Sequence, residues 1–225
     1  SATIALDGTQ DVIWGRTKSD EQYAYSAKYF RNNKAKSPAL SMSHRFMRIT
    51  FSIIAGRDST GSKEPAKTMG VKSLSVVNVP AYAKLIIADR YNPENDGKIE
   101  ADWNYGLTSY DMKDAGDAAF PELDAEKELG YWVKEDEQTV GQGFLLPVPE
   151  EGHTFRIHVV LQDKSGRVFD LNEYPIDLAL KEGFTFEAGK SYNVRITING
   201  SEEIKLRASL KGWESVEDSM DDREF

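Results

Sequence analysis

Apolar and polar residues alternate along most of the chain, with the period of two that half-buried β-strands show. The segment 40–54, LSMSHRFMRITFSII, alternates from Leu40 to Phe46 and then shifts its phase by one residue before Ile49. A phase change inside one strand is what a β-bulge produces. The pattern therefore predicts a long strand over these residues with a bulge near its middle.

Further strands are expected wherever similar apolar runs lie between glycine, proline or other turn-forming residues. These runs are residues 71–79, 83–89, 141–149 and two strands within 153–178. The clearest helical pattern is PELDAEKELGYWV, residues 121–133, with proline in its first turn and glycine near its end. Many short strands separated by turn signals are typical of β-sandwiches.

The most regular alternation lies in residues 184–213, FTFEAGKSYNVRITINGSEEIKLRASLKGW. Residues 192–198 place aromatic and aliphatic side chains on one face, and residues 204–210 repeat that pattern. The pair Asn199-Gly200 between them is a common signal for a two-residue type I′ turn, because both residues tolerate a positive φ. We therefore predict a hairpin with one buried face and one hydrated face.

The stretch DRYNPENDGKIEADWNYG, residues 89–106, is acidic and rich in turn-forming residues, which is typical of a boundary between domains. A chain of 225 residues is long enough for two small all-β domains. We therefore expect an all-β protein with two sandwich domains in tandem. The amino-terminal domain would cover 1–92 and lack its first strands, and the carboxy-terminal domain would cover 93–225.

Composition and charge narrow the possible partners. Hydrophobic residues make up 40% and charged residues 29%, which suits a globular protein. The formal net charge of -9 argues against binding to nucleic acid, whose partners usually carry a basic surface. No apolar run reaches the roughly 20 residues of a membrane span. The sequence has no cysteine, so disulfides and thiol nucleophiles are excluded within it.

No motif argues for catalysis. His153 and His158 are five residues apart, so in a strand they would point to opposite faces and could not chelate one metal as neighbours. His44 is expected to be a strand residue at the edge of a core. Nucleophile elbows, phosphate-binding loops and dinucleotide fingerprints are absent, and ENDGK at 94–98 lacks the ligand spacing of a calcium loop. We expect no enzyme, no cofactor and no metal site.

Aromatic side chains allow a second interpretation, a surface module that binds carbohydrate. Trp103, Tyr105 and Trp132 could form a platform together with Trp14 and Tyr131, since aromatic ring faces stack on the apolar faces of sugars. The alternative is that these rings pack in a core or between domains. Both interpretations stay open from the sequence.

Two motifs in order resemble the fimbrillin family of Bacteroidales, which are pilin-like surface proteins. The first is the strand at 40–54, whose apolar alternation contains a histidine, and DVIWGRT at 11–17 precedes it as in the family. The second is an aromatic residue, Gly-Lys, tyrosine, an alternating strand, a short turn and a final strand that ends in tryptophan. The residues that carry the resemblance are His44, Gly189, Lys190, Tyr192, Asn199, Gly200 and Trp213.

The resemblance implies two transthyretin-like sandwiches in a lipoprotein that is exported to the outer membrane as a pilus shaft, tip or anchor subunit. In family shaft subunits a trypsin-like protease removes an amino-terminal strand, and the vacated groove accepts a strand from the next subunit. Other pilus subunits would be partners, with a host surface protein or glycan as the adhesion target. Because the lipid-bearing cysteine and its following segment are missing, we expect a chain shortened at its amino terminus, without its membrane anchor.

Overall fold

The computed structural model describes residues 1–17, 31, 40–114, 116, 118–147, 155–171, 174–175, 186–201 and 204–211. Its strands are β1 (Ala2–Ala5), β2 (Ile13–Thr17), β3 (Leu40–His44), β4 (Met47–Ala55), β5 (Met69–Pro80), β6 (Tyr82–Leu85), β7 (Ile99–Ala101), β8 (Leu107–Asp111), β9 (Tyr131–Trp132), β10 (Gln138–Leu145), β11 (Arg156–Asp163), β12 (Val168–Asp170), β13 (Tyr174–Pro175), β14 (Ser191–Ile198) and β15 (Ile204–Lys211). Short helical turns are α2 (Glu64–Lys67), η2 (Pro93–Asn95) and η3 (Trp103–Tyr105). The predicted all-β class is confirmed.

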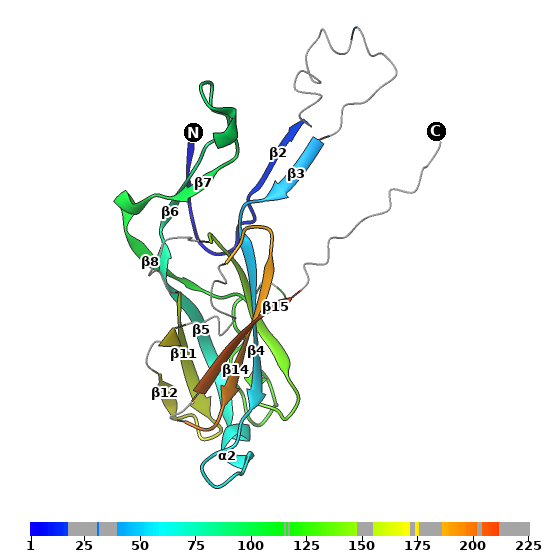
Figure 1. Cartoon of the computed structure of the whole chain (residues 1–225). Helices are drawn as coiled ribbons and strands as arrows, with labels where there is room; N and C mark the ends of the chain where they lie inside the picture. Colours follow the sequence, from blue (N-terminus) through cyan, green and yellow to red (C-terminus); the bar gives the residue numbers. More distant parts are fainter. Residues whose placement is uncertain are drawn as a thin grey trace.

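Two sheets face one another to form a sandwich, seen in the lower part of Figure 1. One sheet has the strand order β10-β4-β14-β15. The other has the order β12-β11-β5-β8, and in it β13 pairs with β11 and β9 pairs with β5. The inner faces meet in one hydrophobic core, where Phe51, Leu74, Leu161 and Ile196 are at most 1% exposed. Alternation along each strand therefore places the apolar side chains between the sheets.

The sandwich is joined along one of its two sides. Beyond β8, Lys113 bridges to Gln142 on β10, and the Gln142 backbone N–H donates to the Lys113 carbonyl at 3.1 Å. The Phe144 N–H donates to the Gly8 carbonyl at 2.8 Å, which covers more of the same edge. On the opposite side, β15 and β12 each pair with a single neighbour among the strands described.

A smaller structure extends from one end of the sandwich (Figure 1). It consists of the three-stranded sheet β1-β6-β7 and the separate two-stranded ribbon β2–β3. Phe46, Ala83 and Leu146 form a second buried cluster beneath it, with Leu6 and Val12 packed against that cluster. The ribbon and the small sheet are therefore attached to the sandwich through a core of their own.

The described strands do not divide into tandem sandwiches at residue 92, which differs from the expected domains 1–92 and 93–225. In one sheet β4 pairs with β10 and β14, and in the other β5 pairs with β8 and β11. The main core contains residues from Met47 to Ile204. The physical reason is that the apolar faces of β4 and β5 are covered by strands that come later in the chain.

The strand predicted over 40–54 is two strands that belong to different sheets. β3 pairs with β2 in the ribbon, whereas β4 enters the sandwich, and Arg45 and Phe46 form the bend between them. The phase change therefore marks a corner and not a bulge. It arises because Phe46 turns into the small buried cluster while the following residues turn into the main core.

The helix predicted over 121–133 is also wrong. Asp124 and Leu129 exchange backbone hydrogen bonds of 3.0 and 3.2 Å across a tight turn, and the residues after it form β9. Pairing with β5 leaves Trp132 only 8% and Val133 only 3% exposed. The preference for helix is overridden because the strand buries these side chains against an existing sheet.

The predicted two-residue turn at Asn199-Gly200 is longer than expected. The last pair of the β14–β15 register is Ile198 with Ile204, so residues 199–203 join the two strands. Neither Asn199 nor Gly200 has a positive φ. Instead Asn199 is 5% exposed and lies against Gly56, where a Cβ atom would overlap its Oδ1 atom. The predicted hairpin itself is confirmed over the described residues.

A polar cluster lies on the outer face of β10-β4-β14, around Glu137. Its Oε1 atom accepts a hydrogen bond from the Ser52 hydroxyl at 2.5 Å, and its other oxygen pairs with Arg195. Burial raises the pKa of Glu137, but Arg195, Ser52 and Asn193 stabilise the charged form and bring the net pKa below its usual value.

We predict that Glu137→Gln lowers the free energy of unfolding at neutral pH and not in acid. A carboxyl group with a lowered folded-state pKa stabilises the protein above its unfolded pKa of about 4.3, and this contribution is lost as the pH falls through the folded value. Urea unfolding across pH measures the difference. Asp136→Asn, at an exposed neighbour, is the control; a constant effect of Glu137→Gln at all pH values would contradict the prediction.

Candidate functional site

The two sequence motifs, far apart in the chain, meet at one corner of the sandwich. The Gly189 N–H donates to the Phe46 carbonyl at 2.9 Å, and the Arg48 N–H donates to the Lys190 carbonyl at 2.9 Å. From these bonds β4 and β14 continue as a parallel pair, from Arg48 opposite Ser191 to Ala55 opposite Ile198. Gly189 and Lys190 therefore lie at the start of the ladder that joins the early and late parts of the chain.

Gly189 and Tyr192 shape this corner in different ways. Gly189 has a φ of 71°, in the left-handed region that glycine adopts without steric cost. Tyr192 is fully buried, its hydroxyl accepts a hydrogen bond from the Glu187 N–H at 2.9 Å, and its ring meets Phe186 edge-on at 4.8 Å. Burial raises the pKa of Tyr192 above its usual value.

His44 lies at the end of β3 on the same corner. Its Nδ1 atom is 2.7 Å from Asp11 Oδ2, which ties the segment before β2 to the end of β3. The other oxygen of Asp11 is buried without a hydrogen-bond partner among the described residues. Gly189 is close by, since a Cβ on it would lie 3.8 Å from the His44 carbonyl oxygen. The histidine thus holds backbone segments together where the ribbon leaves the sandwich.

The remaining sequence candidates lie elsewhere. Trp213 and His153 fall outside the described residues. His158 on β11 faces Asp170 on β12, with Nε2 and Oδ1 2.5 Å apart. Within the described parts of the chain, no group of three or more histidine, aspartate or glutamate side chains is placed to hold a metal ion. None of the helices described is long and apolar enough to span a membrane.

The three aromatic residues suggested as a sugar platform are not brought together. Trp103 and Tyr105 lie on η3, 40% and 56% exposed, and Tyr105 packs on Tyr82 with ring centroids 4.2 Å apart. η3 leads into β8, which pairs with the Pro80 end of β5, whereas Trp132 pairs with Gly70 at its other end. Trp132 is only 8% exposed and donates from its indole to the Leu129 carbonyl at 2.7 Å.

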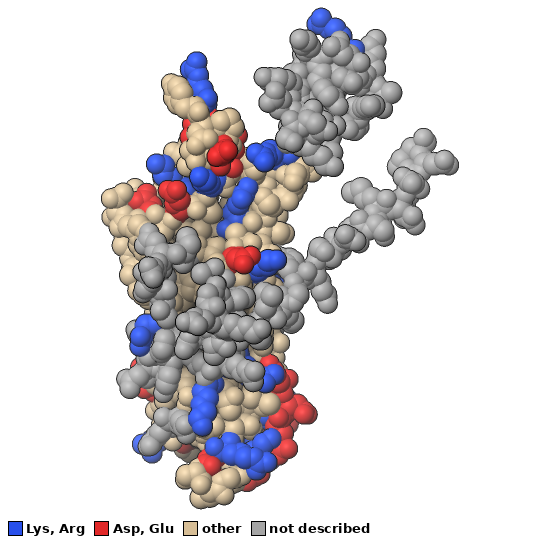
Figure 2. Space-filling model, viewed as in Figure 1, with Lys and Arg blue, Asp and Glu red and all other residues tan. Residues whose placement is uncertain are grey.

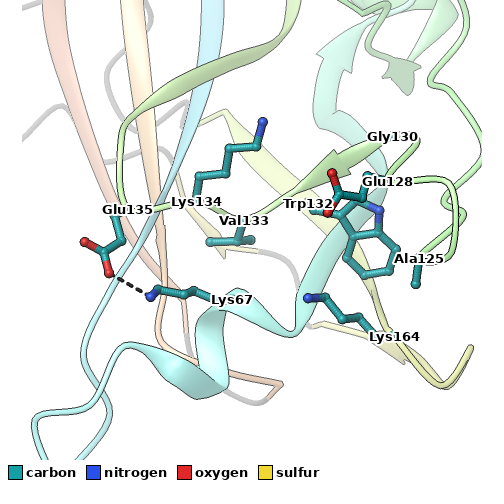
Figure 3. Close-up of a pocket in the computed structure, with 9 residues that line it drawn as sticks. All are labelled: Lys67, Ala125, Glu128, Gly130, Trp132, Val133, Lys134, Glu135 and Lys164. Atoms are coloured by element: carbon teal, nitrogen blue, oxygen red, sulfur yellow. Dashed lines mark ion pairs between the residues drawn. The ribbon is translucent and has the colours of Figure 1, made fainter.

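A pocket of about 380 Å³ lies beside Trp132 near α2 (Figure 3). Lys67 pairs with Glu135 at 2.7 Å and with Glu64 at 2.9 Å, which raises the pKa of Lys67 and lowers that of Glu135. Lys164 points toward the same space (Figure 3). The sequence did not mark this pocket, because its lining comes from three separate segments. Lys67 is already paired with two carboxylates, and Glu128 and Glu135 in the lining offset part of the charge of Lys134 and Lys164.

The outer edge of β15 is a candidate of a different kind, made by the backbone. β15 runs over eight residues and, among the strands described, pairs only with β14. Its outward N–H and C=O groups form an edge onto which another strand can pair. The core beside this edge is filled, since Ile196 and Ile198 on β14 are 0% exposed and Ile204 on β15 is 4% exposed. A strand added here would extend the sheet and not fill a gap in the core.

Comparison with known proteins gives one match over most of the chain. A sequence model of a family described as fimbrillin-like matches residues 10–213. No curated protein matches the chain. Among solved structures, a candidate cell adhesion protein from Bacteroides uniformis is 15% identical, with 93% of this chain and 68% of that chain covered and a TM-score of 0.44.

Two further solved structures are similar over a smaller part of this chain. A candidate cell adhesion protein from Bacteroides fragilis is 11% identical, with 80% of this chain and 54% of that chain covered and a TM-score of 0.38. The fimbrial anchor protein Mfa2 from Porphyromonas gingivalis is 11% identical, with 78% of this chain and 50% of that chain covered and a TM-score of 0.31. This chain thus spans about half the length of these two proteins.

We predict that Gly189→Ala lowers the free energy of unfolding by about 1–2 kcal/mol, because alanine must adopt the left-handed conformation there. Urea unfolding measures the loss. Gly200→Ala is the matched control, since Gly200 lacks a positive φ and a Cβ there would meet Pro65 at an ordinary 3.8 Å. The control should change stability by less than about 0.5 kcal/mol. Equal losses in both variants would refute the role given to Gly189.

Proposed function

Because the chain belongs to the fimbrillin-like family, we propose that it is a structural or accessory subunit of a cell-surface pilus and takes part in adhesion. The observation that carries this proposal is the family match over residues 10–213, which includes both sequence motifs. The corner in which Gly189 and Lys190 bond to the residues around Phe46 supports it, because the motifs act together in the fold. The subunit would act by assembly and binding and not by catalysis.

We place the contact between subunits at the outer edge of β15. A strand from a neighbouring subunit would receive main-chain hydrogen bonds along Ile204–Lys211, the mode of recognition called β-augmentation. Donor and acceptor would be different surfaces of each copy, so repetition gives a filament and not a closed dimer. Other pilus subunits are therefore the partners proposed.

The setting proposed is the outer surface of the cell, with attachment to the outer membrane through a lipid on the precursor. The proposal covers three alternative roles, those of a shaft, a tip or an anchor subunit. The alternative of a carbohydrate-binding surface module built on an aromatic platform receives less support, because Trp132 is buried away from Trp103 and Tyr105. A host surface protein or glycan as the adhesion target remains part of the proposal for a tip role.

The test is assembly after treatment with a trypsin-like protease. We expect multimers that resist SDS, in which the backbone amides of residues 204–211 exchange hydrogen at least about tenfold more slowly than in the monomer, because pairing protects them. Hydrogen exchange with mass spectrometry measures this. Residues 48–55 serve as an internal control, since β4 already lies between β10 and β14 in the monomer.

Two results would count against parts of the proposal. Multimers whose residues 204–211 exchange as fast as in the monomer would exclude the β15 edge as the contact and leave the pilus role intact. A precursor that stays monomeric after proteolysis, alone and with other subunits, would exclude the shaft role and leave tip or anchor.

A further inference from the structure

A second pocket, which we call the neck pocket, lies between the β2–β3 ribbon and the connection from β6 to β7. Its volume is about 510 Å³, which is within the usual range for small-molecule sites. Its lining residues are Trp14, Arg16, Arg45, Pro93, Glu94, Asp96 and Lys98. Figure 2 shows basic and acidic side chains close to one another over this part of the molecule.

Two guanidinium groups lie over one indole ring in this pocket. The Cζ atoms of Arg45 and Arg16 are 4.8 and 5.7 Å from the ring centroid of Trp14, within the range of cation–π contacts. The indole is fixed, because its N–H donates to the Ile87 carbonyl at 3.0 Å. Gly97 allows the close approach: a Cβ there would overlap the Trp14 ring and lie 2.6 Å from Arg45 Nη2. Trp14 and Arg45 are therefore held together by the fold, and the exposed Arg16 lies against the same ring.

The two arginines have no anionic partner in the described part of the chain. The Nε atom of Arg45 is buried without a hydrogen-bond acceptor there. Burial lowers the pKa of Arg45, and the neighbouring charge of Arg16 lowers it further. Two like charges that repel each other, one of them partly removed from water, are unfavourable, and a bound anion would relieve this cost. In the Lys67 pocket, by contrast, the lysine already has two carboxylate partners.

The rest of the lining restricts which anion fits. Glu94 is exposed at the wall, and Asp96 uses its Oδ1 atom to accept from the Asp89 N–H at 2.6 Å, which leaves Oδ2 available. Lys98 donates to Asn95 Oδ1 at 2.7 Å and retains further N–H donors. A ligand with several adjacent negative charges would be repelled by the two carboxylates. A ligand with one negative charge and several hydroxyls would match all of these groups.

We propose that the neck pocket binds an acidic sugar, with the sugar carboxylate on Arg16 and Arg45. The planar guanidinium matches a carboxylate through paired N–H donors, and the hydroxyls of the sugar would donate to Glu94 and Asp96. Because the guanidiniums lie over Trp14, recognition rests on charge and hydrogen bonds and not on stacking against the indole. This site shares no residue with the β15 edge, so the test of sugar binding does not depend on pilus assembly.

The experiment is calorimetric titration of the full chain with methyl β-D-glucuronide, with methyl β-D-glucoside as the neutral match. We expect the glucuronide to bind and the glucoside to show no binding. Arg16→Gln should weaken glucuronide binding at least about tenfold, since it removes a charge-assisted contact. Arg16 is exposed, so this variant should keep the parent melting temperature. Arg45→Gln is the second variant, with the same expected loss.

Arg167→Gln is the matched control, because this exposed arginine also lies over an aromatic ring, with its Cζ atom 4.9 Å from the Phe169 centroid, but far from the pocket in the β11–β12 turn. It should bind the glucuronide as the parent does. The proposal is overturned if the glucuronide does not bind, if the glucoside binds equally well, or if folded Arg16→Gln and Arg45→Gln bind unchanged. Stronger binding of hexaglutamate or inorganic sulfate than of the glucuronide would also overturn it, in favour of an acidic peptide or a simple anion.

Discussion

The parallel pairing of β4 with β14 is the interaction on which the rest of the structure depends. It joins residues 48–55 to residues 191–198. On its other side β4 pairs with β10, and β14 pairs with β15. A parallel pair cannot be closed by a short hairpin, so everything between the two strands must be folded back across the sandwich. Most of the intervening strands do this by forming the opposite sheet, whereas β10 joins the sheet of β4, and β6 and β7 belong to the small sheet. The corner at Gly189 is where this long-range contact begins.

Much of the fold can be read from the period of two, because a strand with one buried face has to alternate. The β14–β15 hairpin and the all-β class follow from that rule. The errors arise where a longer-range contact decided the local structure. Residues 121–133 have a helical pattern, but β5 offers Trp132 a sheet edge. Asn199-Gly200 suits a tight turn, but Asn199 is drawn into a buried position beside Gly56. The tandem division failed for the same reason, since local composition does not report which strands pair.

The candidate sites differ in how visible they are in the sequence. The residues of the corner could be found because they stand in two ordered motifs, and their meeting in space explains why both motifs are needed. The neck pocket could not be found, because Trp14, Arg45 and Lys98 come from three separate segments and become neighbours only through the ribbon and the β6–β7 connection. The sequence shows Trp14 only as an aromatic residue, whereas its proposed role depends on the two arginines over its ring. An edge such as that of β15 has no side-chain signature at all.

The bridge between Lys113 and Gln142 and the hydrogen bond between Gly8 and Phe144 cover the outer edge of β10 and leave the other edge of that sheet, at β15, unpaired among the described strands. One side of the described sandwich is sealed by the protein's own backbone, so strand addition has a single place left along the sheet that contains β4. The opposite sheet keeps an edge of its own, β12, which among the described strands pairs only with β11. If subunits pair at β15 as proposed, the direction of growth would be set within the monomer, by the edge that the chain closes on itself.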